Sequence, residues 1–441
     1  MSDVESILQQ TLGRPFEIEC PTVRIMGRHD FDEPFFKGPG VLRGGIDGPI
    51  QFRIFDHLPP SREDNLRILK AINSREPMRL FATDLDFTEW SGVWFSPLLG
   101  FDTGRDTVSG TFPQLSTRVK LTTGSEERNS TALFYAENLS LPRPKPIKIS
   151  AGDTVEKSPK RFDLHSIHRD DFRIVFSDNL EFGGTQVVAE TRADLSPPIA
   201  EIALAGSVEY ILCRPCRPRV TVRYFEDDAL VFIRECRVQG RTGLPGPLRG
   251  SPAEFQSIWD VFYAFLSQYF NRTEFTPPQT SRILQEVIRA STGTVHTFAA
   301  SLVLGVEGLT QQIFEGQPSE TDPELERLRQ HISRWDGPTG LIDRVLGLAS
   351  MAATPSTTSL LTKLKSRGLV TESQIKVWKE LRPKIAHGNV INYEDEKLWQ
   401  NQNLLISMFH RLVLRLIGYK GPITDFSTDD LRTIEFNWYS D

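Results

Sequence analysis

The first 245 residues consist largely of short runs in which apolar and polar side chains alternate, separated by Gly and Pro. Such runs are typical of half-buried β-strands, because successive side chains of a strand point to opposite faces. Many short strands separated by turns favour a sandwich or a barrel-like architecture. One segment, 62–74, instead has apolar residues at helical spacing and predicts a helix. The clearest strand-like runs are 51–55, 117–121, 131–135, 172–176 and 219–225.

The pattern changes near residue 250, after a stretch rich in Gly and Pro at 240–250. We place the main domain boundary there, which predicts a β-rich region over 1–245 and a helical region over 251–441. The alternating prolines of Leu-Pro-Arg-Pro-Lys-Pro at 141–146 favour extended polyproline backbone. This segment either separates two β modules, with a break near 141–160, or forms one long surface loop.

Beyond the boundary, apolar residues recur three and four positions apart, as on the buried face of a helix. Thr371 and Gln374 have the spacing of a capping box, which predicts a helix start. Gly418 stands where a helix would end with a left-handed residue. The expected fold class is therefore α+β, a β-rich, sandwich-like N-terminal region followed by an all-α helical bundle. Helices are expected from Ser251 onward and over 294–314, 324–335, 339–351, 371–382 and 394–417.

Composition narrows the classes of protein that this chain can represent. Apolar residues make up 39% and charged residues 24%, which is globular composition. The net charge of −6 excludes a globally basic nucleic-acid coat, but it leaves room for a local basic site. No apolar run reaches the length of a membrane span, which argues against an integral membrane protein. The N-terminus lacks the basic-then-apolar pattern of a secretion signal, and four cysteines are few for a disulfide scaffold. We therefore expect a cytoplasmic protein with no membrane partner.

The best candidate for chemistry is the segment Arg-Pro-Lys-Ile-Ala-His-Gly at 382–388. Ile375, Trp378 and Arg382 share one helix face, so the guanidinium lies in line with an apolar stripe and needs a partner. A proline after Arg382 disfavours helical geometry, which predicts that the helix ends or kinks there. Such a break would let Arg382 and His387 approach each other, and Gly388 would let the backbone turn.

The same segment is locally basic. Between residues 363 and 384 there are seven Lys or Arg and two Glu, a net charge of +5 within a chain of net −6. A patch of this kind suits a polyanion, and its binding should depend on salt. The alternative is an ordinary solvated helix face.

An Arg-x4-His pair followed by Gly, placed between two long helices of a C-terminal helical domain, resembles the HEPN superfamily. The β-rich N-terminal half and the chain length resemble its Apea-like branch, whose members are bacterial anti-phage defence ribonucleases. The HEPN resemblance covers about residues 280–441. It implies a homodimer or higher homo-oligomer with composite sites, acting in abortive infection on RNA, with tRNA as one candidate and a phage-derived trigger. No cofactor or metal is implied.

The resemblance also implies roles for individual residues. His387 would move a proton and Arg382 would stabilise charge on the phosphorane-like transition state, while the RNA's own 2′-hydroxyl attacks the adjacent phosphate and leaves a 2′,3′-cyclic phosphate. Glu307, inside an apolar helix, would pair with Arg382 and orient it, or is an ordinary half-exposed glutamate. Supporting and RNA-binding roles fall to Lys384, Gly388, Lys376 and Lys379.

The sequence departs from the family pattern at Pro383, where many active members carry Asn, Asp or His. The alternative function is therefore a catalytically inactive, HEPN-like protein that dimerises or binds RNA.

A metal site is the main competitor for the chemistry. Cys213 and Cys216 have ligand spacing, and Cys236 with His165 and His168 would complete a zinc site. These ligands lie apart in sequence, so we expect the cysteines to be simple thiols.

The aromatic residues of the N-terminal half are a further candidate surface. Trp90, Trp94 and Phe95 could bind a ligand, but we expect them to belong to the core, as in other β-sheet proteins. Nucleotide hydrolysis, zinc proteolysis of the His-Glu-x-x-His type and serine hydrolysis have no supporting motif.

Overall fold

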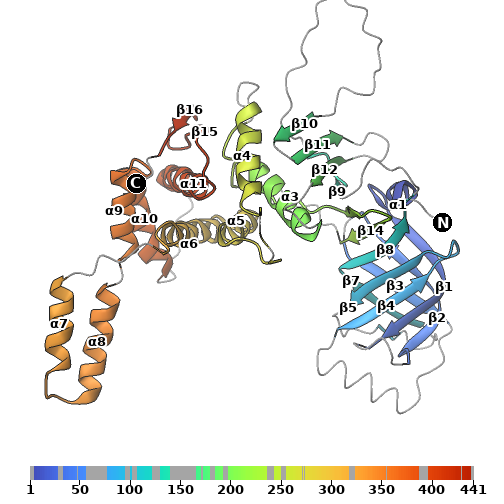
Figure 1. Cartoon of the computed structure of the whole chain (residues 1–441), viewed down its shortest axis with the longest axis horizontal. Helices are drawn as coiled ribbons and strands as arrows, with labels where there is room; N and C mark the ends of the chain where they lie inside the picture. Colours follow the sequence, from blue (N-terminus) through green and yellow to red (C-terminus); the bar gives the residue numbers. More distant parts are fainter. Residues whose placement is uncertain are drawn as a thin grey trace, which may run out of the picture. The chain divides into compact units, whose positions relative to one another are not determined.

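A computed structural model of the chain describes most of its length (Figure 1). The described residues are 4–27, 33–46, 48–55, 77–94, 100–101, 107–121, 130–139, 165–169, 172–178, 184–191, 197–235, 243–249, 255–270, 272, 274–316, 323–353, 355–386, 396–428 and 430–438. The expected helix at 62–74, the expected cap at Ser251, the Pro-rich segment at 141–146 and the possible break near 141–160 lie outside them.

The chain divides into two compact units. The sheet unit comprises Met1–Gly240 and Leu266–Pro277, and the helical unit comprises Arg241–Phe265 and Pro278–Asp441. The expected α+β class is confirmed, with a large antiparallel sheet in the N-terminal half and a helical C-terminal region.

All described strands of the sheet unit belong to one antiparallel sheet, in the order β10-β11-β12-β9-β13-β14-β8-β5-β4-β1-β2-β3-β7-β6. The five strand-like runs seen in the sequence coincide with parts of β3, β8, β9, β11 and β13, and two of them extend one residue beyond a strand end. The strands are β1 (Phe16–Met26), β2 (Phe36–Gly44), β3 (Ile50–Phe55), β4 (Met78–Thr83), β5 (Glu89–Trp94), β6 (Gly100–Phe101), β7 (Thr107–Phe112), β8 (Gln114–Lys120), β9 (Ser130–Tyr135), β10 (His165–Arg169), β11 (Phe172–Asp178), β12 (Thr185–Thr191), β13 (Val220–Tyr224) and β14 (Asp228–Arg234).

A bend at Pro113 curls this sheet. Pro113 alone separates β7 from β8, yet β7 pairs with β3 while β8 pairs with β5 and β14. In the sheet order, β8 and β7 are separated by five other strands, although they are neighbours in the chain. The sheet must therefore turn back on itself between β8 and β7 (Figure 1). Of the two expected architectures, a sandwich or a barrel-like fold, this single curled sheet is nearer to the barrel-like one. A bent strand carries the chain around the corner, and the described strands form one continuous sheet rather than two stacked ones.

The core of the sheet unit fills the inside of the curl. Alternate residues of the strands, such as Ile18, Leu42 and Leu80, are buried there, and helix α1 (Val4–Thr11) adds Ile7 and Leu8. Every residue of β9 is buried. Helix α3 (Pro197–Leu212) packs on β9, β12 and β13, which explains why β9 has no exposed face. No helical stripe marked α3 in the sequence, because its residues are apolar around most of the helix.

The helical unit contains the remaining described helices and a C-terminal hairpin. Helix α4 (Phe255–Ser267) spans the division between the two units. The others are α5 (Gln279–Ala290), α6 (Val295–Ile313), α7 (Pro323–Ser333), α8 (Thr339–Ala353), α9 (Thr357–Ser366), α10 (Glu372–Ala386) and α11 (Glu396–Leu416). Strands β15 (Gly421–Thr424) and β16 (Thr433–Phe436) pair beyond α11, so the expectation of an all-α region was wrong.

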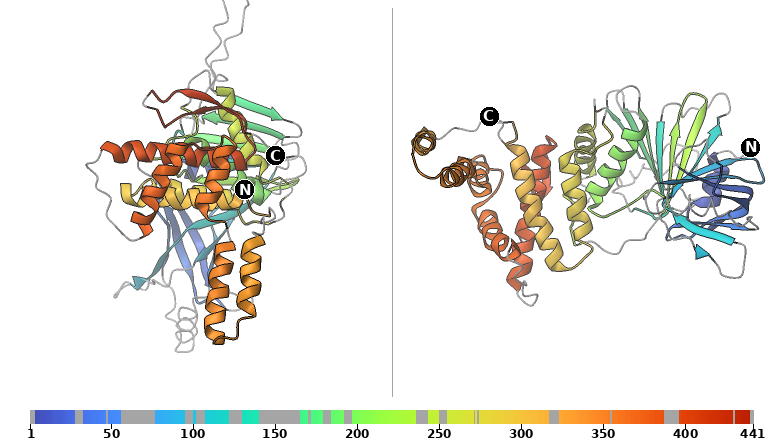
Figure 2. Two further views of the ribbon diagram at one scale, coloured as in Figure 1. Left: turned by 90° about the vertical axis from the view of Figure 1, so that its left-hand side faces the viewer. Right: turned by 90° about the horizontal axis from the view of Figure 1, so that it is seen from below.

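Helix α6 is the centre of this bundle and packs against α5, α9, α10 and α11 (Figure 2). Its buried side chains include Phe298, Leu302 and Val306. Helices α7 and α8 pack against each other as a hairpin. None of the helices in the described part of the chain is long and apolar enough to cross a membrane.

The predicted helix ends are present. The backbone N–H of Thr371 donates to Gln374 Oε1 at 2.9 Å, and the N–H of Gln374 donates to Thr371 Oγ1 at 3.3 Å, which is a reciprocal capping box. Gly418 follows α11 with φ +74°, the left-handed conformation that glycine adopts without steric cost.

Candidate active site

Arg382 lies at the border between the buried and exposed faces of α10. Ile375, Trp378 and Leu381 are buried against the bundle, and the Trp378 indole N–H donates to the carbonyl of Val303 on α6 at 3.1 Å. The Arg382 guanidinium carbon lies 5.8 Å from the centre of the Trp378 ring. Its position four residues after Trp378 follows from the helical spacing.

The guanidinium is held by Glu307 of α6. Arg382 Nε donates to Glu307 Oε2 and Arg382 Nη2 donates to Glu307 Oε1, each at 3.1 Å. The Thr357 hydroxyl donates to the same Oε1 at 3.4 Å. The predicted pairing of Glu307 with Arg382 is therefore present, in the two-pronged geometry that suits a planar guanidinium. The hydrogen bond that Arg382 donates to Glu307, and then the negative charge of Glu307, raise the pKa of Arg382 above its ordinary value.

The pair is accessible from one side. The side chain of Arg382 is 46% exposed and that of Glu307 is 21% exposed. A guanidinium carries five N–H donors, and Glu307 occupies only two of them. The arrangement can therefore present the remaining donors to an anion while Glu307 and the Trp378 ring hold the orientation.

The prediction that the helix ends at Arg382 is wrong. Helix α10 continues through Pro383 and ends at Ala386. Pro383 removes one donor from the last turn, and the carbonyl of Lys379 loses that hydrogen bond. The buried stripe that packs on α6 keeps the helix intact despite this loss. His387 and Gly388 lie outside the described residues. The structure therefore gives the position of Arg382 but not that of His387, its proposed catalytic partner.

The basic residues around Arg382 do not all face the same way. Lys384 lies two positions further, about 200° around the helix, and pairs with Glu380 at 3.2 Å. Lys365 of α9 pairs with Glu372 at 2.7 Å. These pairs, like that of Arg382, neutralise part of the local positive charge. Lys376 and Lys379 are exposed on α10, and Lys379 contributes to the lowered pKa of Glu372 after the larger effect of Lys365.

The cysteines have the character of buried thiols. Cys213 and Cys216 follow α3 and are both buried, and this burial raises the pKa of each well above its ordinary value. No group of three or more His, Cys, Asp or Glu side chains that could hold a metal ion occurs among the residues described. His165 and His168 lie on β10, and Cys236 is outside the described residues.

Of the three aromatic candidates, Trp90 belongs to the core as expected. Its indole N–H donates to Asp84 at 2.9 Å. Phe95 and the side chain of Trp94 lie outside what the structure describes.

Two contributors to the Arg382 site were not assigned a role from the sequence. The ring of Trp378 supports the guanidinium, and its spacing from Arg382 was a usable signal for this. The hydroxyl of Thr357 contacts Glu307 from another helix, α9, and nothing local in the sequence marks it. No protein-family model, curated protein or solved structure matches this chain.

Proposed function

We propose that the helical unit is a metal-independent endoribonuclease of the HEPN type. The observation that carries the proposal is the half-exposed Arg382 guanidinium, held by Glu307 and Trp378 near the end of α10. The chain leaves that helix one residue before His387. A pre-oriented guanidinium with free donors is suited to charge that develops on a phosphate.

In this reaction the RNA 2′-oxygen attacks the adjacent phosphorus and the bond to the 5′-oxygen breaks. The products are a 2′,3′-cyclic phosphate and a 5′-hydroxyl end. The proton of the 2′-hydroxyl is lost and the leaving oxygen gains one, and His387 is the group suited to move a proton near neutral pH. Arg382 stabilises the additional negative charge on the phosphate oxygens, and exposed Lys376 and Lys379 attract the RNA backbone.

The biological setting belongs to the same proposal. A cytoplasmic homodimer whose sites combine two protomers, activated by a phage-derived trigger and acting on RNA such as tRNA in abortive infection, follows from the family resemblance. The sheet unit would then act as the sensor or regulatory module.

Two observations favour a second candidate function, an inactive HEPN-like unit that dimerises or binds RNA. Helix α10 continues through Pro383 to Ala386, so a helix end at Arg382 does not bring His387 toward the guanidinium. The charge of Arg382 is also matched by Glu307, which is how a purely structural ion pair is built.

Incubating the full chain with mixed RNA in a chelator, followed by analysis of the RNA ends, tests the proposal. We expect cyclic phosphate ends from the wild type and none from His387→Ala or Arg382→Ala. Arg43→Ala is a matched control, because Arg43 makes a similarly exposed two-pronged pair with Glu17 in the sheet unit.

Cleavage that persists in both variants would place the chemistry elsewhere in the chain. RNA that is bound but never cut would support the second candidate. RNA that is neither bound nor cut, by a chain that is also monomeric in solution, would refute both.

A further inference from the structure

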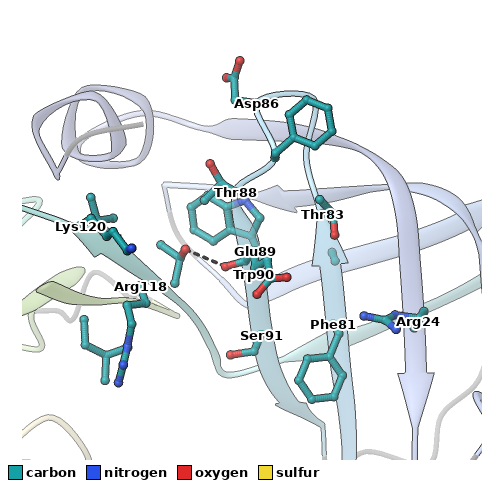
Figure 3. Close-up of a pocket in the computed structure, with 15 residues that line it drawn as sticks. Arg24, Phe81, Thr83, Asp86, Thr88, Glu89, Trp90, Ser91, Arg118 and Lys120 are labelled. Carbon is teal, nitrogen blue, oxygen red and sulfur yellow. Dashed lines mark hydrogen bonds between the residues drawn. The ribbon is translucent and has the colours of Figure 1, made fainter. Parts of the chain in front are cut away.

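A cavity of about 590 Å³ lies on the sheet unit beside the turn between β4 and β5. Strands β1, β4, β5 and β8 contribute to it (Figure 3). Several of its lining residues, such as Arg24, Glu89 and Arg118, are exposed and alternate with buried positions of these strands. Its size is within the range of roughly 300–1,000 Å³ that is usual for small-molecule sites. The lining residues used below are Arg24, Phe87, Glu89, Arg118 and Lys120.

The turn at the edge of this cavity is held rigidly. The carboxylate of Asp84 accepts hydrogen bonds from the backbone N–H of Asp86 at 2.9 Å, from that of Thr88 at 2.8 Å and from the Trp90 indole at 2.9 Å. Because Trp90 is anchored in the core, these bonds tie the turn to the interior of the sheet unit.

The turn between β4 and β5 leaves the side chain of Phe87 exposed to solvent. The residue is 87% exposed, and its φ of 62° is a left-handed conformation that bulky side chains rarely adopt. Both the exposure of the ring and the backbone conformation cost free energy, and such costs persist where a site uses the residue. The turn thus presents a fixed aromatic face at the edge of the cavity.

The charges of the cavity are mixed rather than uniform. Figure 3 shows Arg118 and Lys120 on one side and Arg24 on the other, with Glu89 between them. Arg118 makes one contact of 3.3 Å with Asp228 and remains largely exposed. For Arg24, Lys120 and Glu89 the described residues supply no side-chain hydrogen bond or ion pair.

The geometry points to a nucleotide-binding site, for a ligand that combines a flat base, a sugar with hydroxyl donors and a phosphate. The base stacks on Phe87, the phosphate meets Lys120 and Arg118, and the Glu89 carboxylate accepts from a ribose hydroxyl or a base amino group. A simple anion would leave the aromatic face unused, and an apolar ligand would leave the charges unpaired. This site is independent of the proposed ribonuclease, since it lies in the other unit.

The same chemistry has two sources, a free nucleotide or an unpaired nucleotide of RNA. Binding should be measured by calorimetry with AMP, GMP, CMP and UMP, and with inorganic phosphate, on the full chain. A short fluorescent single-stranded RNA forms the second arm, in the His387→Ala background so that cleavage cannot change the probe. Saturable binding of mononucleotides identifies the free ligand. RNA binding that Phe87→Ala weakens, without binding of mononucleotides, identifies RNA as the ligand of the cavity.

Variants at the cavity then test the site itself. Phe87→Ala should weaken binding about tenfold to a hundredfold, as expected for the loss of one stacked base. Leu85→Ala, on the same turn and also exposed but outside the cavity lining, should bind as the wild type does. Lys120→Gln should weaken binding roughly fivefold or more, whereas Lys37→Gln on the exposed face of β2 should not.

Three results would overturn the proposal. These are no binding of any probe, unchanged affinity in Phe87→Ala and Lys120→Gln, or inorganic phosphate binding as tightly as the nucleotides. The ribonuclease proposal is decided separately by the RNA-end assay, so the two proposals can fail independently.

Discussion

Replacing Arg382 with alanine separates a structural role of the Arg382–Glu307 pair from a catalytic one. A half-exposed ion pair contributes about 0.5–1 kcal/mol even with good geometry. Stacking of a cation on an accessible ring contributes about 0.5–1 kcal/mol more. Arg382 has one contact of each kind, so Arg382→Ala should destabilise the region by about 1–2 kcal/mol.

That loss is small beside a typical domain stability of about 5–15 kcal/mol, so the variant should stay folded. Its effect on catalysis should be larger. Removing a group that stabilises transition-state charge usually lowers the rate about 100- to 1,000-fold. The two roles therefore differ by an amount that experiment can resolve.

Hydrogen exchange of the α6 and α10 amides is the suitable stability assay, because a chain of two units has no single unfolding free energy. Exchange in Arg382→Ala should speed up about 5- to 30-fold, the factor that corresponds to 1–2 kcal/mol. Glu307→Gln keeps the size of the side chain and removes its charge. In a double-mutant cycle the two changes should couple by at most about 1 kcal/mol.

RNA cleavage by the same variants completes the comparison. Full activity in Arg382→Ala would refute the catalytic role. Protection lost by far more than thirtyfold, together with activity, would show that the pair is mainly structural. If Glu307 orients Arg382, Glu307→Gln should lower the rate, and a higher rate would mean that Glu307 instead holds the guanidinium away from its substrate.

Three further predictions concern stability. Glu201→Ala should destabilise the sheet unit by about 3–5 kcal/mol, because it leaves Arg223 and Arg234 partly buried without their carboxylate partner. An unchanged melting temperature would contradict this prediction. Burial lowers the pKa of His410 from 6.5 to about 4 in the folded state. As the pH falls from 6.5 toward 4, the unfolded chain therefore binds a proton that the folded chain does not, and the free energy of unfolding should decrease by roughly 3 kcal/mol. His410→Phe should flatten that part of the pH–stability curve. Phe87→Gly should be about 1 kcal/mol more stable than Phe87→Ala in thermal unfolding, because glycine adopts the left-handed turn conformation freely.

Local patterns in the sequence predict several helices of the helical unit. Helices α6, α8 and α11 begin and end within a few residues of their predicted bounds, because an amphipathic stripe and a cap are properties of neighbouring residues. The pairing of Glu307 with Arg382 was one of two readings of Glu307, suggested by the family resemblance, and the structure contains the pair. The sequence likewise determined the division between a β-rich half and a helical half.

Tertiary packing decided the features that local signals predicted wrongly or not at all. Pro383 is a local signal for a helix break, yet the packing of α10 on α6 outweighs one missing hydrogen bond and the helix continues. Helix α3 has no stripe because it is apolar around most of its circumference. The Phe87 turn is anchored through Trp90, which pairs with Thr117 of β8, a strand that is distant in sequence. These outcomes arise from contacts between remote segments, and no window of neighbouring residues records such contacts.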